Sequence, residues 1–162
     1  MMEAKIRKPA VAGQFYAGDA RELRHDLKEC FLQCKASPLK PVQAIIVPHA
    51  GYVFSGVTIA SAFACIQPDA QYEHIFLLGP SHHVYLDKAS MNIEATEYAT
   101  PLGNVQVDTA LCKSLLEQSD AFTYNNKAHD SEHCLEVELK LAQIGGVTEG
   151  YHTCIVWTRT QL

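Results

Sequence analysis

Two short apolar runs, residues 44–47 and 75–78, constrain the fold of this chain more than any other feature. Neither run alternates between apolar and polar residues, a pattern typical of strands that are covered on both faces. Proline, glycine and histidine follow each run within a few residues, and the first two end a strand and turn the backbone. Between the runs, residues from Ser55 to about Ile66 have helical spacing. The order strand, helix, strand predicts a right-handed crossover unit.

The rest of the chain alternates between helical and strand-like patterns. Residues 131–144 fit both, because their apolar residues alternate whereas their length and composition favour a helix, which we expect. The 162 residues suffice for one domain, so we expect a single α/β domain with a mainly parallel sheet flanked by helices. The other expected elements are an extended arm over 7–16, a helix from Asp19 to about Cys34, exposed strands at 91–95 and 102–107, a helix after Asp108 and a strand at 153–157.

Charge and composition exclude several classes of protein. Thirteen basic residues against 18 acidic ones give a net charge of −5, and the basic residues form no stripe, so we expect no nucleic-acid or membrane partner. No apolar run approaches the roughly 18 residues of a membrane span, and the first residues lack the apolar core of a signal peptide. We expect a cytoplasmic protein whose six cysteines, all within apolar segments, are free thiols.

Each of the two apolar runs leads into a histidine, His49 or His82. In an open α/β sheet, ligands collect outside the carboxyl ends of the strands, where both imidazoles would lie. Two histidines with one carboxylate or thiolate leave coordination positions open and suit iron or copper. The alternative is that each histidine is only a hydrogen-bonded structural residue.

A third histidine group comprises His129 and His133, with Asp130 and Glu132 beside them. On a helix the two histidines would share a face, and the acids could orient them. The alternative is that Asp130 or Ser131 merely caps the next helix while the histidines face solvent. Glycine-rich phosphate loops and a serine-nucleophile elbow are both missing from the sequence.

Five motifs in order resemble the Memo family, whose bacterial and archaeal members are called AmmeMemoRadiSam system protein B. The resemblance runs from about Arg7 to Ile144. It implies a fold like the N-terminal part of the class III extradiol dioxygenases, an α/β sheet with a metal pocket at one end. The motifs are Arg7-x-Pro9 with Val11-Ala12-Gly13-x-Phe15-Tyr16, Pro48-His49-Ala50-Gly51-Tyr52 with Ser55-Gly56, Gly79-Pro80-Ser81-His82-His83, Thr100-Pro101-Leu102-Gly103, and His129-Asp130-x-Glu132-His133-x-Leu135-Glu136.

The resemblance also implies roles for individual residues. His49 and His82 match the family's two histidine ligands for iron or copper, and Tyr16 and Tyr52 match positions near the pocket, where they would contact substrate. Independently of the resemblance, a histidine that does not bind the metal could move protons, and we expect His133 to have this role. The family's third ligand, a cysteine toward the C-terminus, has no counterpart here. We therefore expect residues 1–162 to form a single Memo-like domain that lacks the family's C-terminal part and binds metal weakly.

Three functions are compatible with this sequence. The first is a metal-dependent, dioxygenase-like oxidoreductase that acts on a small molecule. The second is a non-catalytic module that binds a peptide or protein through Tyr16 and Tyr52, and the third is an inactive, truncated relic. An uncovered sheet edge would in addition favour self-association.

Overall fold

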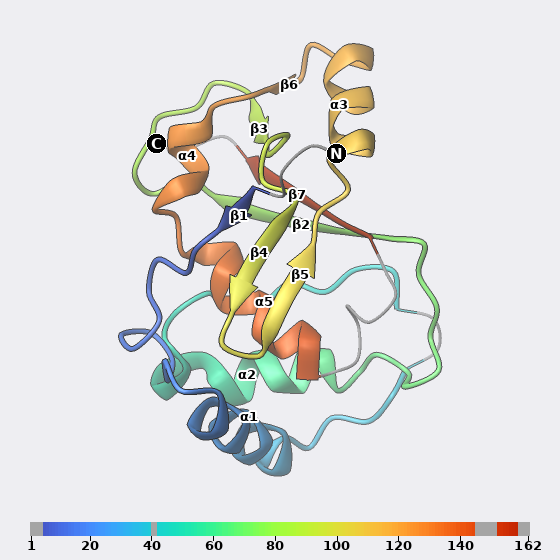
Figure 1. Ribbon diagram of the computed structural model, residues 1–162. Helices are drawn as coiled ribbons and strands as arrows, with labels where there is room; N and C mark the ends of the chain where they lie inside the picture. Colours follow the sequence, from blue (N-terminus) through green and yellow to red (C-terminus); the bar gives the residue numbers. More distant parts are fainter. Residues whose placement is uncertain (1–4, 40–41, 145–151, 159–162) are drawn as a thin grey trace.

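The structure is a computed structural model that describes residues 5–39, 42–144 and 152–158, the last of these through the backbone. It is a mixed α/β arrangement in which helices pack around two small sheets (Figure 1). The helices are α1 (Ala20–Gln33), α2 (Tyr52–Phe63), α3 (Thr109–Gln118), α4 (Asn126–Asp130) and α5 (Cys134–Ile144). The strands are β1 (Ile6–Arg7), β2 (His74–Pro80), β3 (Ala89–Met91), β4 (Glu97–Thr100), β5 (Gly103–Gln106), β6 (Phe122–Thr123) and β7 (His152–Thr158).

Both sheets combine parallel and antiparallel pairs. In the sheet ordered β1-β4-β5, β1 runs parallel to β4 and β4 antiparallel to β5. In the sheet ordered β2-β7-β3-β6, β7 runs parallel to β2 and antiparallel to β3, which is parallel to β6. The expectation of a mainly parallel sheet is therefore not confirmed.

The strand predicted at residues 44–47 does not form, and with it the predicted crossover unit is wrong. This segment has no regular structure, although it lines the same cavity as β2. Ile45 and Val47 pack against the core while Ile46 is 99% exposed, so only one face of the segment is covered. The unbroken apolar run led us to expect cover on both faces, which the described residues do not supply.

β2 itself forms where the second apolar run predicted it, and the strand predicted at 153–157 is β7, its parallel neighbour. Among the described residues β2 pairs only with β7, which leaves it at the edge of its sheet. Phe76 and Leu78 on β2 are 48% and 60% exposed. Self-association through this edge stays a prediction.

Helix α5 is the centre of the core. Its residues contribute to two hydrophobic clusters. Val137 and Leu141 pack in the cluster that includes residues of α1 and α2. Leu135 and Leu139 pack in the cluster that includes residues of β2 and the β4–β5 pair. Even its polar residues Glu136 and Lys140, along with Ala142, are buried. A helix covered on every side shows no single apolar stripe, which explains why its sequence fits a strand as well.

The other helices begin close to the predicted positions. The Asp19 side chain accepts hydrogen bonds from the backbone N–H groups of Arg21 and Glu22 and caps α1, and Asp108 caps α3 in the same way. Helix α2 begins at Tyr52, three residues before the predicted start at Ser55.

The predicted pair of exposed strands is shifted along the chain. The structure pairs β4 with β5, residues 97–106, instead of 91–95 with 102–107. Gly103 makes this possible because its φ of +121° at the tight connection suits glycine and few other residues.

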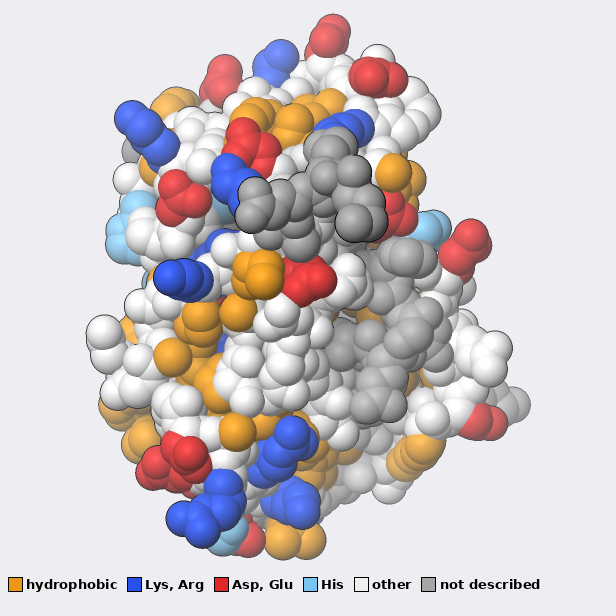
Figure 2. Space-filling view, viewed as in Figure 1, with side chains coloured by type: hydrophobic (Ala, Val, Ile, Leu, Met, Phe, Trp, Pro, Cys, Tyr) orange, Lys and Arg blue, Asp and Glu red, His pale blue; other side chains and the backbone are white. Residues whose placement is uncertain are grey.

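Figure 2 shows how charged side chains are distributed on one face of the molecule. Acidic and basic side chains are interspersed with hydrophobic ones over the face in Figure 2. No helix in the described part of the chain has both the length and the apolar character that crossing a membrane requires. The five cysteines whose side chains are described are free thiols, as predicted; Cys154 lies outside these side chains.

Candidate metal centre

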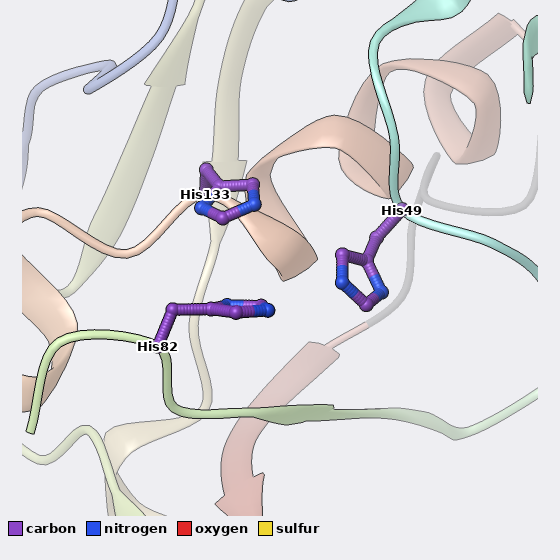
Figure 3. A group of neighbouring side chains, drawn as sticks. All are labelled: His49, His82 and His133. Carbon is purple, nitrogen blue, oxygen red and sulfur yellow. The ribbon is translucent and has the colours of Figure 1, made fainter. Parts of the chain in front are cut away.

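Three histidines from distant parts of the sequence converge at one place. His49 lies in the loop before α2, His82 follows β2, and His133 directly precedes α5 (Figure 3). Their ligating nitrogens all lie within 4.8 Å of one another. One metal ion bound at about 2.0–2.1 Å by each nitrogen requires separations of roughly 3.3 Å, so a small closure of the side chains brings all three into a coordination sphere.

The rings are arranged around a common space. Their centroids are 5.1 Å apart for His49 and His82, 4.6 Å for His82 and His133, and 5.9 Å for His49 and His133. Phe15 packs edge-on against His133, with 4.8 Å between the two ring centroids, and covers one side of the His133 ring. His82 is the exposed member, so the centre is open to solvent on its side.

Glu132 joins two of these histidines through a buried carboxylate. Its Oε1 lies 2.8 Å from Nδ1 of His82 and 3.1 Å from Nδ1 of His133. The same oxygen accepts the backbone N–H groups of His133 and Cys134, and Oε2 accepts that of His82. A carboxylate at Nδ1 favours the Nδ1–H tautomer, which leaves Nε2 of each ring free to bind a metal.

The electrostatics favour the protonation states that metal binding needs. Burial lowers the pKa of His49, and the nearby His82 lowers it further. Burial also lowers the pKa of His133, against the opposing effect of Glu132. For Glu132, burial alone would raise the pKa, but the hydrogen bonds from His82, His133 and Cys134 outweigh it and keep the pKa below its usual value. Neutral imidazoles at His49 and His133, beside an ionised Glu132 carboxylate, favour binding of a cation.

Gly79 allows β2, which leads to His82, to lie close to the start of α5, which follows His133. A Cβ at this position in β2 would lie 2.6 Å from Sγ of Cys134 and 2.8 Å from Cδ2 of Leu135, closer than real contacts permit. A larger residue at this position would therefore force Cys134 or Leu135, at the start of α5, to shift. Because His82 follows β2 and His133 directly precedes α5, the close approach of these two elements is consistent with the short separation of the two histidine rings.

A second group of possible ligands, His82 with Glu132 and Cys134, overlaps the first. The Cys134 thiol is 1% exposed and donates to the Pro80 carbonyl, and burial raises its pKa strongly, which disfavours the thiolate. The Glu132 oxygens are already occupied by N–H donors. The three histidines are the better ligand set.

The structure separates His129 from His133. No single helix holds both, because α4 ends at Asp130 and α5 begins at Cys134, so the two histidines do not share a helix face. His129 is buried elsewhere, with Nε2 2.9 Å from Oγ of Ser90, and burial lowers its pKa to about 3. Only His133 of this pair reaches the site.

Tyr16 and Tyr52 lie in the hydrophobic core and are 5% and 8% exposed. The hydroxyl of Tyr16 donates to Glu136, and that of Tyr52 donates to the carbonyl of Val137. Contact of either ring with a substrate stays a prediction. The residue that sequence reasoning missed is Arg7, which contacts the segment carrying Glu132 and is more than 120 residues away in sequence.

Comparison with known proteins gives one consistent result. Residues 7–149 match the Memo-like protein family. A MEMO1 family protein of Saccharomyces cerevisiae is 36% identical over 146 residues, covering 84% of this chain and 43% of the relative. A MEMO1 family protein of Methanobrevibacter smithii is 33% identical over 148 residues (85% and 52%), and one of Nitrosopumilus maritimus is 37% identical over 145 residues (85% and 51%). The chain thus spans about half the length of the curated relatives it matches.

Proposed function

The chain belongs to the Memo-like family, and from this premise we propose that it binds one redox-active metal ion, iron or copper, through His49, His82 and His133. The observation that carries the proposal is the convergence of three imidazoles around a space that Glu132 borders. Glu132 contacts two of the three, His82 and His133, through their Nδ1 atoms, as a carboxylate that orients metal-binding histidines does.

The ligand set supports iron or copper over hard cations. Imidazole nitrogens suit zinc, copper, iron and nickel, whereas magnesium and calcium prefer oxygen. Three nitrogens leave at least one coordination position for a substrate, and His82 is exposed on that side. A bound iron or copper ion would supply Lewis-acid and electron-transfer chemistry there, so we propose a metal-dependent oxidoreductase acting on a small molecule.

We assign His133 as a ligand in place of its sequence-based role as a proton donor or acceptor. Its Nδ1 faces Glu132, and its ligating nitrogen lies within 4.8 Å of those of His49 and His82. The two roles predict different results for His133→Ala. A ligand variant loses metal, whereas a proton-transfer variant keeps the metal and loses turnover.

Metal binding by the purified chain tests the proposal. We expect anaerobic titration with Fe²⁺ and Cu⁺ to give one ion per chain, and His49→Ala, His82→Ala and His133→Ala each to weaken binding by at least about tenfold. His25→Ala, which removes an exposed histidine of α1, serves as the control and should bind as the parent does. A folded chain that binds neither metal contradicts the proposal and supports the non-catalytic module or the inactive relic.

A further inference from the structure

Arg7 is a buried arginine that reaches from the N-terminal arm to the turn between α4 and α5. Its Nε donates to the carbonyl of His129 at 3.2 Å, and Nη2 donates to the carbonyl of Glu132. Nη1 donates to the carboxylate of Glu136 in the first turn of α5. One guanidinium thus holds three acceptors that lie on both sides of the turn.

These acceptors lie where the chain lacks helical support. The last carbonyls of a helix have no partner within it, and α4 ends at Asp130, next to His129. The residues between α4 and α5 include both Glu132 and His133. The planar guanidinium, with five N–H donors in fixed directions, can bridge such a break, whereas the flexible ammonium group of lysine offers no comparable fork.

Arg7 is in turn held by contacts that do not involve the site. The Glu136 carboxylate that pairs with it also accepts the backbone N–H groups of Ala10 and Val11, which fixes the arm on α5. The ring of Tyr98 lies 5.1 Å from the guanidinium carbon. The guanidinium is 6% exposed and its ion-pair partner 1%, so solvent competes little with these bonds.

We propose that Arg7 is a positioning residue for the metal centre. It fixes the main chain at Glu132, and this directs the carboxylate toward His82 and places the His133 ring opposite it. The inference rests on the proposed metal-binding function, because its consequence is measured as metal affinity and geometry.

A double-mutant cycle with Co²⁺ as the probe tests this proposal. We expect Arg7→Lys to weaken Co²⁺ binding by at least about tenfold and to give a visible spectrum like that of His133→Ala. Because Arg7 acts through the segment carrying His133, adding Arg7→Lys to His133→Ala should cause little further loss of Co²⁺ affinity. Leu27→Ala is the control, since it destabilises the hydrophobic cluster of α1, α2 and the later residues of α5, a cluster to which neither Glu132 nor His133 belongs, and it should leave the spectrum unchanged.

Each outcome of the cycle decides one point. If the losses of Co²⁺ affinity from Arg7→Lys and His133→Ala add up in the double variant, Arg7 does not act through His133 and the proposal is overturned. The same holds if Arg7→Lys keeps the spectrum and the Co²⁺ affinity of the parent. In both cases the proposed metal site is unaffected. A parent chain that binds no Co²⁺, Fe²⁺ or Cu⁺ overturns the proposed function instead.

A second measurement needs no variant and covers the case in which Arg7→Lys does not fold. Saturating the parent chain with Zn²⁺ should slow the solvent exchange of the Arg7 Nε–H, measured by NMR, while that of the exposed Arg21 stays unchanged. Equal exchange rates for Arg7 with and without Zn²⁺ overturn the proposal.

Discussion

The Glu132 carboxylate contacts His82 at two points, with Oε2 accepting its backbone N–H at 2.6 Å and Oε1 lying 2.8 Å from its Nδ1. This double contact joins the turn before α5 to the loop after β2. It fixes both the main chain and the ring of His82 relative to His133. The geometry of the candidate metal centre therefore depends on a residue that does not itself need to bind metal.

Replacing Glu132 with glutamine tests this dependence. The neutral amide accepts hydrogen bonds less strongly and turns an NH₂ group toward N–H donors. The rings of His82 and His133 therefore lose the carboxylate that both contact. We expect Glu132→Gln to weaken metal binding by about 10- to 100-fold in calorimetric titration. Glu117→Gln, an exposed change on α3, is the matched control. Equal affinities for the two variants would show that Glu132 does not orient the ligands.

The approach of α5 to β2 is tested by comparing two glycines. Gly79→Ala forces a Cβ against Cys134 and Leu135, whereas Gly56→Ala forces one to 2.7 Å from Sγ of Cys30, between α2 and α1. Both variants should lower the midpoint of thermal unfolding, because each creates overlap in a packed core. Only Gly79→Ala should also weaken metal binding. A loss of affinity of the same size in Gly56→Ala contradicts this explanation.

His129 makes the fold sensitive to acid. Burial lowers its pKa to about 3 from an ordinary value of 6.5. Between these values the unfolded chain binds a proton that the folded chain does not, so the free energy of unfolding falls as pH decreases from about 6.5, by up to about 1.4 kcal/mol per pH unit. We expect His129→Gln to reduce this slope in urea unfolding measured from pH 7 to pH 4. An unchanged slope would assign the acid sensitivity to other groups.

Glu138 produces the opposite dependence. It lines an apolar cavity of about 320 Å³, and burial raises its pKa to about 8 from an ordinary value of 4.5. In this window the unfolded carboxyl is ionised and the folded one is protonated, so its contribution to stability falls as pH rises toward 8. We expect Glu138→Gln to be more stable than the parent at pH 8, by on the order of 2 kcal/mol, and similar at pH 5. A parent that is the more stable protein at pH 8 contradicts this assignment.

The structure brings together the two histidines that the sequence singled out, His49 and His82, whereas it does not confirm the mainly parallel sheet. His49 and His82 could be recognised because proline and glycine beside them mark a sharp turn, which is local information. The strand predicted at 44–47 is wrong because an apolar run does not reveal whether one face or both will be covered, and Ile46 faces solvent. The hydrogen bonds of Arg7 join residues more than 120 positions apart, and no local pattern encodes them.

Anomalous diffraction from crystals of the metal-loaded chain, recorded at the absorption edge of the bound iron or copper, tests the three-histidine centre most directly. We predict a single peak about 2.0–2.2 Å from one ring nitrogen each of His49, His82 and His133, with Glu132 still at Nδ1 of His82. A peak coordinated by Cys134 and Glu132 instead, or no peak near these histidines in a chain loaded with one ion, would contradict it.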